Sequence, residues 1–305
     1  MLNLWLIFTQ VLLPILVLIG LGWILDRQWQ LSLATLVRLN IYLVVPAFIF
    51  YEVVHSSLSA GMAGQVMLFT LCIMAGMFVL SALIARACGY SAAVRRGLQL
   101  TTMFYNSGNY GVPLMTLAYP VLGPVLQVFV VLTQNISTFT VGLWLASAQG
   151  RAAGWRALLP MLRQVSLWAV AVALLVRWLH LPVQTWRWLW VPVEYLHSAL
   201  VGVALVTLGV QLAQAKPVAH LPQVRWALGL RLVAAPLLAA VLIPLFPFQG
   251  ETARIMILSA GFPTAVNVAL LVHEFEGDSH FAATVVFYST VLSLVTVTLL
   301  IAWLR

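Results

Sequence analysis

Two stretches of the sequence place asparagine beside glycine and proline inside long apolar segments. The first, NSGNYGVP, runs from Asn106 to Pro113, and the second, SAGFPTAVN, runs from Ser259 to Asn267. Glycine favours non-helical backbone, and proline lacks an N–H and crowds the carbonyl four residues earlier, so each stretch is predicted to interrupt a helix. The N–H groups of an interrupted helix and the asparagine amides are hydrogen-bond donors, and donors without negative charges favour an anion.

These interruptions are the predicted substrate site. Pro113 should free the carbonyl of Asn109, and Pro263 should free that of Ser259, so that two free carbonyls and two half-helix N-termini meet in the membrane. The competing explanation is that proline and glycine only kink the helices for packing, and the matched pair of interruptions favours the binding role. The predicted substrate-binding residues are Asn106, Gly108, Asn109, Tyr110, Gly111, Pro113, Gly261, Phe262, Pro263, Thr264 and Asn267.

A second group of polar residues has two interpretations. Gln127, Gln134 and Thr138 share one helical face, because steps of seven and four residues nearly close whole turns. They either line the substrate path or form hydrogen bonds between helices, and Ser289 has the same alternatives. Arg231 lies about two turns inside an apolar segment. We expect it to extend to the cytoplasmic interface, and the alternative is that it attracts an incoming anion along the path.

Composition fixes the class of protein. Of the 305 residues 63% are hydrophobic and 7% are charged, which indicates a polytopic membrane protein. The net charge of +8 comes from basic residues scattered between apolar segments, so no nucleic-acid partner is expected and the partners are the lipid bilayer and a solute. Cys72 and Cys88 have no paired spacing, so neither a disulfide framework nor a zinc site is indicated.

Neither a metal, a cofactor nor a catalytic group is predicted. The segment HEFEGDSH, from His273 to His280, is expected to be a solvated turn in which Asp278 or Ser279 caps the next helix. No acidic residue lies at mid-depth in an apolar segment, so a cation site would have to use backbone carbonyls.

Ten apolar runs are long enough to cross a bilayer, and the first is expected to be a retained helix rather than a removable signal. They lie at about Leu4–Leu25, Leu33–Val53, Gly64–Ala85, Gly97–Ala118, Pro124–Ala148, Leu162–Leu179, Val193–Ala213, Val224–Phe246, Thr252–His273 and Phe281–Leu304. Ten basic residues fall on one side of this arrangement and four on the other. The positive-inside rule therefore places both termini on the outer side of the bacterial cytoplasmic (inner) membrane.

The chain divides into two halves of five apolar runs. Residues 1–148 form the first predicted repeat, residues 149–163 a cytoplasmic linker, and residues 164–305 the second repeat. Pro113 and Pro263 are 150 residues apart, and each lies in the fourth run of its half. An odd number of spans inverts the second half relative to the first, so the predicted fold is all-α, with ten transmembrane helices in two inverted five-helix repeats.

The first interruption carries a family resemblance. The pattern NxGxxGxPL, from Asn106 to Leu114, resembles the fourth-helix signature of the auxin efflux carrier family, whose bacterial members include malonate and malate permeases. Weaker similarities are LVTLGVQL from Leu205, RLVAAP from Arg231 and PTA from Pro263, so the resemblance covers the whole chain.

The resemblance implies broken fourth and ninth helices that cross at their prolines, with binding and crossover roles for Asn106, Pro113 and Pro263. It further implies a scaffold from helices 1, 2, 6 and 7, a transport domain from helices 3–5 and 8–10, a small organic anion as substrate, and a homodimer. Tyr110 stands where many members have an aliphatic residue. The expected function is secondary transport of a mono- or dicarboxylate by alternating access, and not an enzymatic one. The alternatives are a passive anion channel and a non-transporting membrane receptor.

Overall fold

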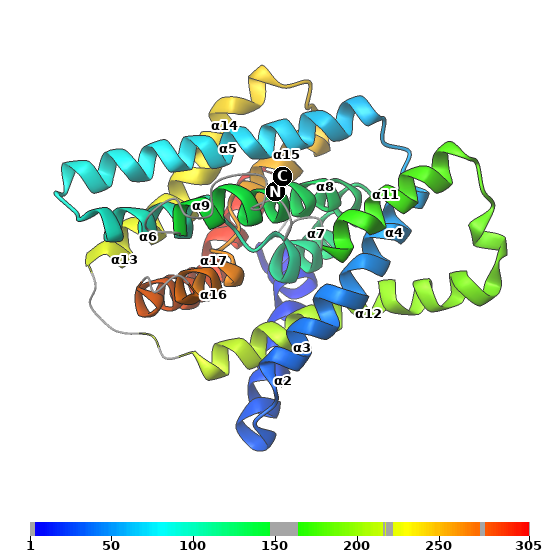
Figure 1. The fold of residues 1–305 in the computed structure, drawn as a ribbon, viewed down its shortest axis with the longest axis horizontal. Coiled ribbons are helices and arrows are strands. Elements are labelled where there is room, and N and C mark those ends of the chain that lie inside the picture. Colours follow the sequence, from blue (N-terminus) through cyan, green and yellow to red (C-terminus); the bar gives the residue numbers. More distant parts are fainter. Residues whose placement is uncertain (1–3, 147–163, 216, 218–221, 275–277, 305) are drawn as a thin grey trace.

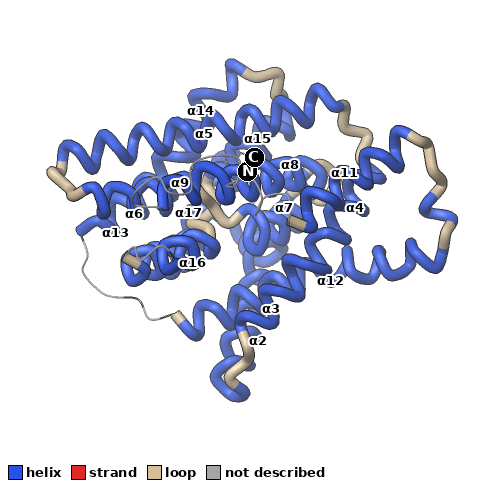
Figure 2. Tube along the Cα trace, in the orientation of Figure 1, coloured by secondary structure: helices blue, strands red, loops and turns tan. Residues whose placement is uncertain are grey.

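The computed structural model describes residues 4–146, 164–215, 217, 222–274 and 278–304. These residues form helices joined by short connections, and their only β-type pairing is a bridge between Tyr105 and Thr264 (Figures 1 and 2). The all-helical class predicted from the apolar runs is therefore confirmed for the described part of the chain.

The helices follow the predicted apolar runs in order. In the first half they are α1 (Leu4–Ile7), η1 (Phe8–Leu12), α2 (Leu13–Trp29), α3 (Leu33–Leu39), η2 (Asn40–Val44), α4 (Val45–His55), α5 (Ala60–Ala87), α6 (Ala92–Met103), η3 (Ser107–Gly111), α7 (Val112–Ala118), α8 (Gly123–Ser137), η4 (Thr138–Gly142) and α9 (Leu143–Ala146). In the second half they are α11 (Val165–Trp178), η6 (Val183–Thr185), α12 (Arg187–Gln214), α13 (Pro222–Gly229), η7 (Leu230–Ala234), α14 (Ala235–Leu242), η8 (Ile243–Leu245), α15 (Gly250–Ala260), α16 (Val266–Glu274) and α17 (Ser279–Leu304).

Seven helices in the described part are long and apolar enough to cross a membrane. Among the three remaining predicted spans, the sixth is α11, which has 14 residues, and the fourth and ninth are each divided into two shorter helices. A multi-pass membrane protein is thus supported, while the count of ten spans and their inverted order remain predictions.

Proline explains most of the irregular helical turns. Four π-helical turns, η1, η2, η3 and η7, are each followed two residues later by a proline, namely Pro14, Pro46, Pro113 and Pro236. Proline cannot donate to the carbonyl one turn earlier and its ring crowds that carbonyl, so a wider turn before it relieves the conflict. The interruption at Pro113 differs from the other three because the chain before it leaves the helical conformation altogether.

Helix α12 packs closely along α2. A Cβ atom added to Gly209 would overlap the backbone carbonyl of Ile19, and one added to Gly22 would overlap that of Val206. Small residues allow this approach, as is common between membrane helices. In Figure 1, α2, α3 and α12 lie along one edge of the molecule, and α5 and α14 lie along the opposite edge.

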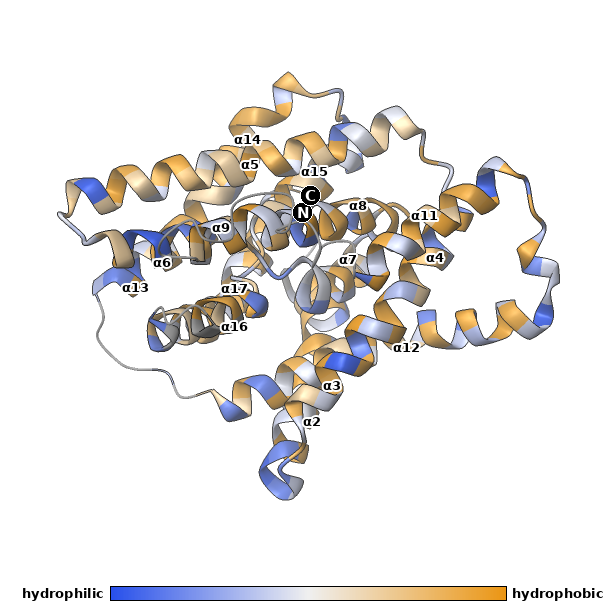
Figure 3. Ribbon diagram, in the orientation of Figure 1, coloured by the Kyte–Doolittle hydropathy of each residue, from blue (hydrophilic) through white to orange (hydrophobic). Residues whose placement is uncertain are grey.

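The outer surface is apolar and several polar side chains are buried. Leu68, Val79 and Leu83 of α5 are exposed, whereas Gln127 and Thr133 of α8 are buried. Most of α5 is hydrophobic along its length (Figure 3). A soluble protein rarely exposes so much apolar surface, but a bilayer makes it favourable. The polar residues inside therefore mark the part of the protein that interacts with something other than lipid.

Candidate functional site

The two predicted interruptions lie in direct backbone contact. Helix α6 ends at Met103 and α15 ends at Ala260, and the extended residues that follow them run antiparallel to each other. The N–H of Asn106 donates to the carbonyl of Pro263 at 2.7 Å, and the N–H of Ala265 donates to the carbonyl of Phe104 at 3.0 Å. Each interruption thus satisfies peptide groups of the other, which is a requirement for irregular backbone at membrane depth. We call this pairing, residues 104–106 with 263–265, the crossover.

One detail of the predicted site is wrong. The carbonyl of Ser259 is not left free by Pro263, because it accepts a hydrogen bond from the N–H of Phe262 at 3.3 Å. The backbone tightens into a shorter turn at the end of α15, as helix ends often do. The second interruption therefore offers no free carbonyl at Ser259.

Asn106 caps the helical turn that begins the second half of the first interruption. Its side-chain oxygen accepts from the N–H of Tyr110 at 3.3 Å, and its backbone carbonyl accepts from the N–H of Gly111 at 2.9 Å. The side-chain nitrogen Nδ2 of Asn106 has no hydrogen-bond partner among the described residues, although the residue is only 6% exposed. A buried amide without an acceptor is costly, so this donor marks a position for a ligand.

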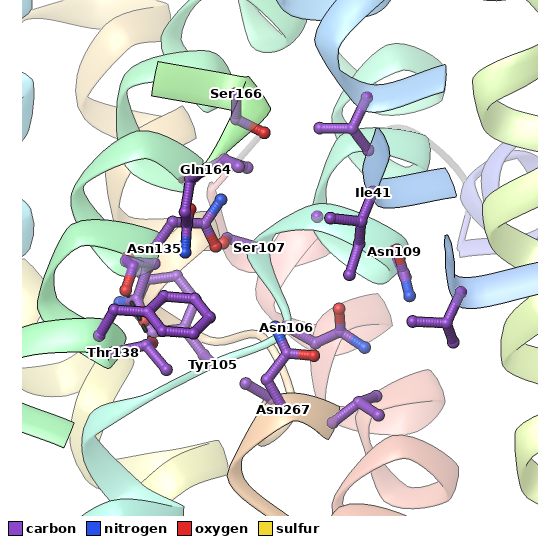
Figure 4. Close-up of a pocket in the computed structure, with 18 of the residues that line it drawn as sticks. Ile41, Tyr105, Asn106, Ser107, Asn109, Asn135, Thr138, Gln164, Ser166 and Asn267 are labelled. Carbon is purple, nitrogen blue, oxygen red and sulfur yellow. Dashed lines mark hydrogen bonds between the residues drawn. The ribbon is translucent and has the colours of Figure 1, made fainter. Parts of the chain in front are cut away.

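A cavity of about 370 Å³ adjoins the crossover (Figure 4). One wall comes from the crossover, α8 and η4, and the other comes from the second span and the start of α11. The lining residues are Val37, Ile41, Tyr42, Val45, Tyr105, Asn106, Ser107, Gly108, Asn109, Val131, Gln134, Asn135, Thr138, Phe139, Gln164, Val165, Ser166, Ala265, Val266 and Asn267.

Both half-helix N-termini open onto this cavity. Gly108 and Asn109 belong to the first turn of η3, and Val266 and Asn267 begin α16. The first N–H groups of a helix have no intrahelical acceptor and carry partial positive charge. Of the described residues that line the cavity, none is charged. The electrostatics of the cavity therefore favour one negative group held by neutral donors.

Six of the predicted residues line the cavity and ten do not. Those in the lining are Asn106, Gly108, Asn109, Gln134, Thr138 and Asn267. Those outside it are Tyr110, Gly111, Pro113, Gly261, Phe262, Pro263, Thr264, Gln127, Arg231 and Ser289. The second group lies around the crossover and holds it in shape.

Tyr110, Gly111 and Phe262 pack behind the crossover. The rings of Tyr110 and Phe262 meet edge to face with centroids 5.7 Å apart. A Cβ atom at Gly111 would lie 2.6 Å from the Phe262 ring and 2.7 Å from the amide nitrogen of Gln127. Glycine is needed at this position because the two interruptions approach too closely for any side chain.

Gln127 and Ser289 serve as hydrogen-bonding supports. The amide nitrogen of Gln127 donates to the carbonyl of Ser107 at 2.8 Å, and its oxygen accepts from the hydroxyl of Ser259 at 3.1 Å, so one side chain joins both interruptions. Ser289 accepts from the N–H of Thr264 at 3.1 Å. For these two residues the structure favours hydrogen bonding between helices over the path-lining interpretation.

Arg231 does not extend to the membrane interface, so that expectation is wrong. Its side chain is fully buried and donates to the backbone carbonyls of Thr102 and Ala260. Two buried carbonyls at helix ends compensate the charge inside the protein, and this removes the need to reach water.

Several lining residues were not predicted as site residues. Tyr105 and Ser107 flank the first asparagine, Asn135 lies on the polar helix α8, and Gln164 and Ser166 lie at the start of α11. Asn135 was detectable as one of the few amides in an apolar segment. Gln164 and Ser166 lie where an apolar run begins, so the sequence offers no sign that they face a cavity.

Asn40 does not line the cavity, but it contacts Asn109, which does. Its side-chain nitrogen donates to the side-chain oxygen of Asn109 at 2.7 Å, and its own oxygen has no partner among the described residues. Asn40 is almost fully buried at the start of η2. The hydrogen bond between Asn40 and Asn109 therefore connects the second span to the first interruption.

Asp278 caps the following helix, as predicted, whereas His273 and Glu274 of the expected turn belong to α16. The carboxylate of Asp278 accepts from the N–H of Phe281 at 2.9 Å and so caps α17. No group of three or more metal-binding side chains occurs among the residues that were placed. The linker at residues 149–163 lies outside the described residues.

Comparison with known proteins adds an independent observation. The model of a family described as "Membrane transport protein" matches residues 158–301, which include Arg231 and the second interruption. The chain is also 27% identical over 296 residues to an "Uncharacterized transporter" of Methanothermobacter thermautotrophicus, an alignment that covers 95% of this chain and 96% of that protein. The likeness therefore extends over both halves.

Proposed function

We propose that this chain, which is similar to membrane transport proteins over residues 158–301 and to a transporter over 95% of its length, carries a small organic anion across the cytoplasmic membrane by alternating access. One observation carries the proposal. Two half-helix N-termini and the unpaired amide of Asn106 open onto a single cavity whose described lining is uncharged. A carboxylate would supply the missing acceptor and the favourable charge.

The cavity favours a carboxylate with an apolar body over a small dicarboxylate. Val37, Ile41 and Val45 line one wall, and Val131 and Phe139 line another. Apolar walls suit a hydrocarbon or aromatic body, while the lining offers no fixed cation for a second carboxylate. A monoanion leaving an inside-negative cell gains roughly 2.3 kcal/mol per 100 mV, so efflux needs no coupling ion.

The proposed mechanism moves the crossover against a scaffold. The scaffold consists of the first, second, sixth and seventh spans, consistent with the packing of α12 along α2 and of α11 along α4. The crossover, with the other spans, forms the moving group, and the cavity lies where the two groups meet. The proposal includes two inverted five-helix repeats, both termini outside the inner membrane, and assembly as a homodimer.

An enzymatic role is not proposed. A nucleophile would need a base within hydrogen-bond reach in the cavity, and among the described lining residues there is no histidine, carboxylate or lysine to serve as that base. Transport therefore accounts for the site better than chemistry on a substrate does.

The test begins with thermal-shift screening of purified protein against mono- and dicarboxylates, followed by liposome flux of any compound that stabilises it. Saturable uptake accelerated by the same anion on the opposite side would support the proposal. Asn106→Ala should abolish this exchange, whereas Thr133→Val, at a buried residue bonded only within its own helix, should retain it. Non-saturable flux would indicate a channel, and binding without flux would indicate a receptor.

A further inference from the structure

Arg231 lies in the wide turn η7, in the middle of the span from Pro222 to Leu245. Its side chain is 0% exposed and is the largest among the fully buried ones described. Nη1 donates to the carbonyl of Thr102 at 2.7 Å, and Nη2 donates to the carbonyl of Ala260. No salt bridge of Arg231 occurs in the part of the chain that the structure describes.

Both acceptors lie at helix C-termini. Thr102 belongs to the last turn of α6, and Ala260 is the final residue of α15, so these are the ends of the first half of each interrupted helix. The last carbonyls of a helix lack intrahelical donors and carry partial negative charge. Two such ends directed at one point make a position that is favourable for a cation, and the guanidinium occupies it.

The face of Tyr105 completes this position. The central carbon of the guanidinium, Cζ, lies 4.8 Å from the centroid of the Tyr105 ring, a distance at which a cation is attracted to an aromatic face. Tyr105 also lines the cavity, whereas Arg231 does not. The ring thus belongs to both sites, and Arg231 acts on the crossover through the backbone rather than on the solute by contact.

We propose that Arg231 is an attached substitute for a bound cation. Its guanidinium fills the position between the C-termini of α6 and α15, so the crossover holds its shape without sodium or potassium. The positive charge is then permanent and moves with the crossover. The proposal predicts that anion transport is independent of sodium and potassium. This prediction about transport rests on the proposed function.

Arginine suits this position better than lysine. The planar guanidinium presents donors in two directions and reaches two carbonyls at once, while an ammonium is a compact charge on a flexible stem. Arg231→Lys should therefore retain part of the stability, and Arg231→Ala should lose it, because two buried carbonyls are left without donors.

The test uses purified protein and needs no substrate. Arg231→Ala should melt about 5 °C or more below wild type, and guanidinium chloride at non-denaturing, millimolar concentration should restore part of the loss. Sodium chloride and potassium chloride at the same concentration serve as the comparison, and the effect of guanidinium chloride on the melting temperature of Arg231→Ala should exceed theirs. The control is Arg177→Ala, because Arg177 also donates to a carbonyl, that of Val53 at 3.4 Å, but outside the crossover. Guanidinium should not raise its melting temperature.

Wild-type protein tests the proposal even where Arg231→Ala cannot be purified. Its melting temperature should be the same in sodium, potassium and N-methylglucamine chloride at equal ionic strength. A specific rise with sodium or potassium, or an Arg231→Ala variant as stable as wild type, or one that guanidinium does not restore, would overturn the proposal. Absence of carboxylate binding by wild type would refute the proposed function and leave these melting results unaffected.

Discussion

The side-chain amide of Asn40 donates to the side-chain oxygen of Asn109 at 2.7 Å, and so connects the second span to the first interruption. The two residues are 69 positions apart, and Asn109 lines the cavity. If the crossover moves against the second span during transport, this hydrogen bond must break in each cycle. A bond of this kind stabilises one conformation by about 1 kcal/mol.

Removal of this bond should change the rate of exchange more than the affinity. Asn40→Ala is expected to shift the balance between cavity orientations by roughly tenfold at most, since about 1.4 kcal/mol corresponds to a factor of ten. Anion exchange in liposomes and equilibrium binding measure the two effects separately. Thr35→Ala, on the exposed face of α3, is the control. An Asn40→Ala variant with unaltered exchange would show that the bond does not limit the motion.

Asn106 caps a helical turn and, in the proposed function, donates to the bound anion, and two variants separate these roles. Asn106→Asp keeps the oxygen that caps Tyr110 but replaces the unpaired donor with a negative charge. It should fold with near-normal stability and lose carboxylate affinity by about tenfold or more, because a hydrogen bond to a charged group contributes about 1.5–3 kcal/mol. Asn106→Ala should lose both the cap and the affinity. Normal binding by Asn106→Asp would remove this residue from the site.

Gln127 and Gln134 lie seven residues apart on α8 and should respond in opposite ways. Gln127→Leu leaves the buried carbonyl of Ser107 without its donor and should cost about 1–3 kcal/mol of stability. The side-chain atoms of Gln134 make no hydrogen bond within the described residues, although the Tyr105 hydroxyl lies nearby. Gln134→Leu should therefore leave the melting temperature near wild type and weaken anion binding. The reverse pattern would contradict the assignment of these roles.

The contact between α2 and α12 has a matched pair of glycines for testing. Gly209→Ala places a methyl group against the carbonyl of Ile19 and should destabilise the protein by about 1–3 kcal/mol. Gly202→Ala, on the same helix, meets nothing within 4 Å and should be neutral or slightly stabilising. Thermal melting of the two variants measures the difference. Equal melting temperatures would mean that α2 and α12 do not pack this closely.

The sequence was sufficient to predict features that depend on local pattern. Apolar runs predicted the helices, and proline with glycine predicted both interruptions, because these residues act on the backbone next to them. The cap by Asp278 is another local feature, and it was predicted as well.

Features that depend on distant partners were not predictable in the same way. The charged side chain of Arg231 can be accommodated inside a membrane either by reaching water or by donating to buried acceptors. Its acceptors are backbone carbonyls, which the types of residues in the sequence do not reveal. Gln164 and Ser166 enter the cavity wall only because α11 packs along α4 and η2, which lie at the same cavity. The sequence likewise could not show that Gln127 supports the crossover while Gln134 lines the cavity, since both lie on the same face of one helix.

The central claim is that the crossover holds a carboxylate by neutral donors, and the most direct test is equilibrium binding to purified wild-type protein. Each carboxylate found by screening is compared with the uncharged primary amide of the same carbon skeleton. The acid should bind at least about tenfold more tightly than the amide, and Asn106→Asp should abolish this preference. Equal affinity for acid and amide, or a preference that survives in Asn106→Asp, would contradict the claim.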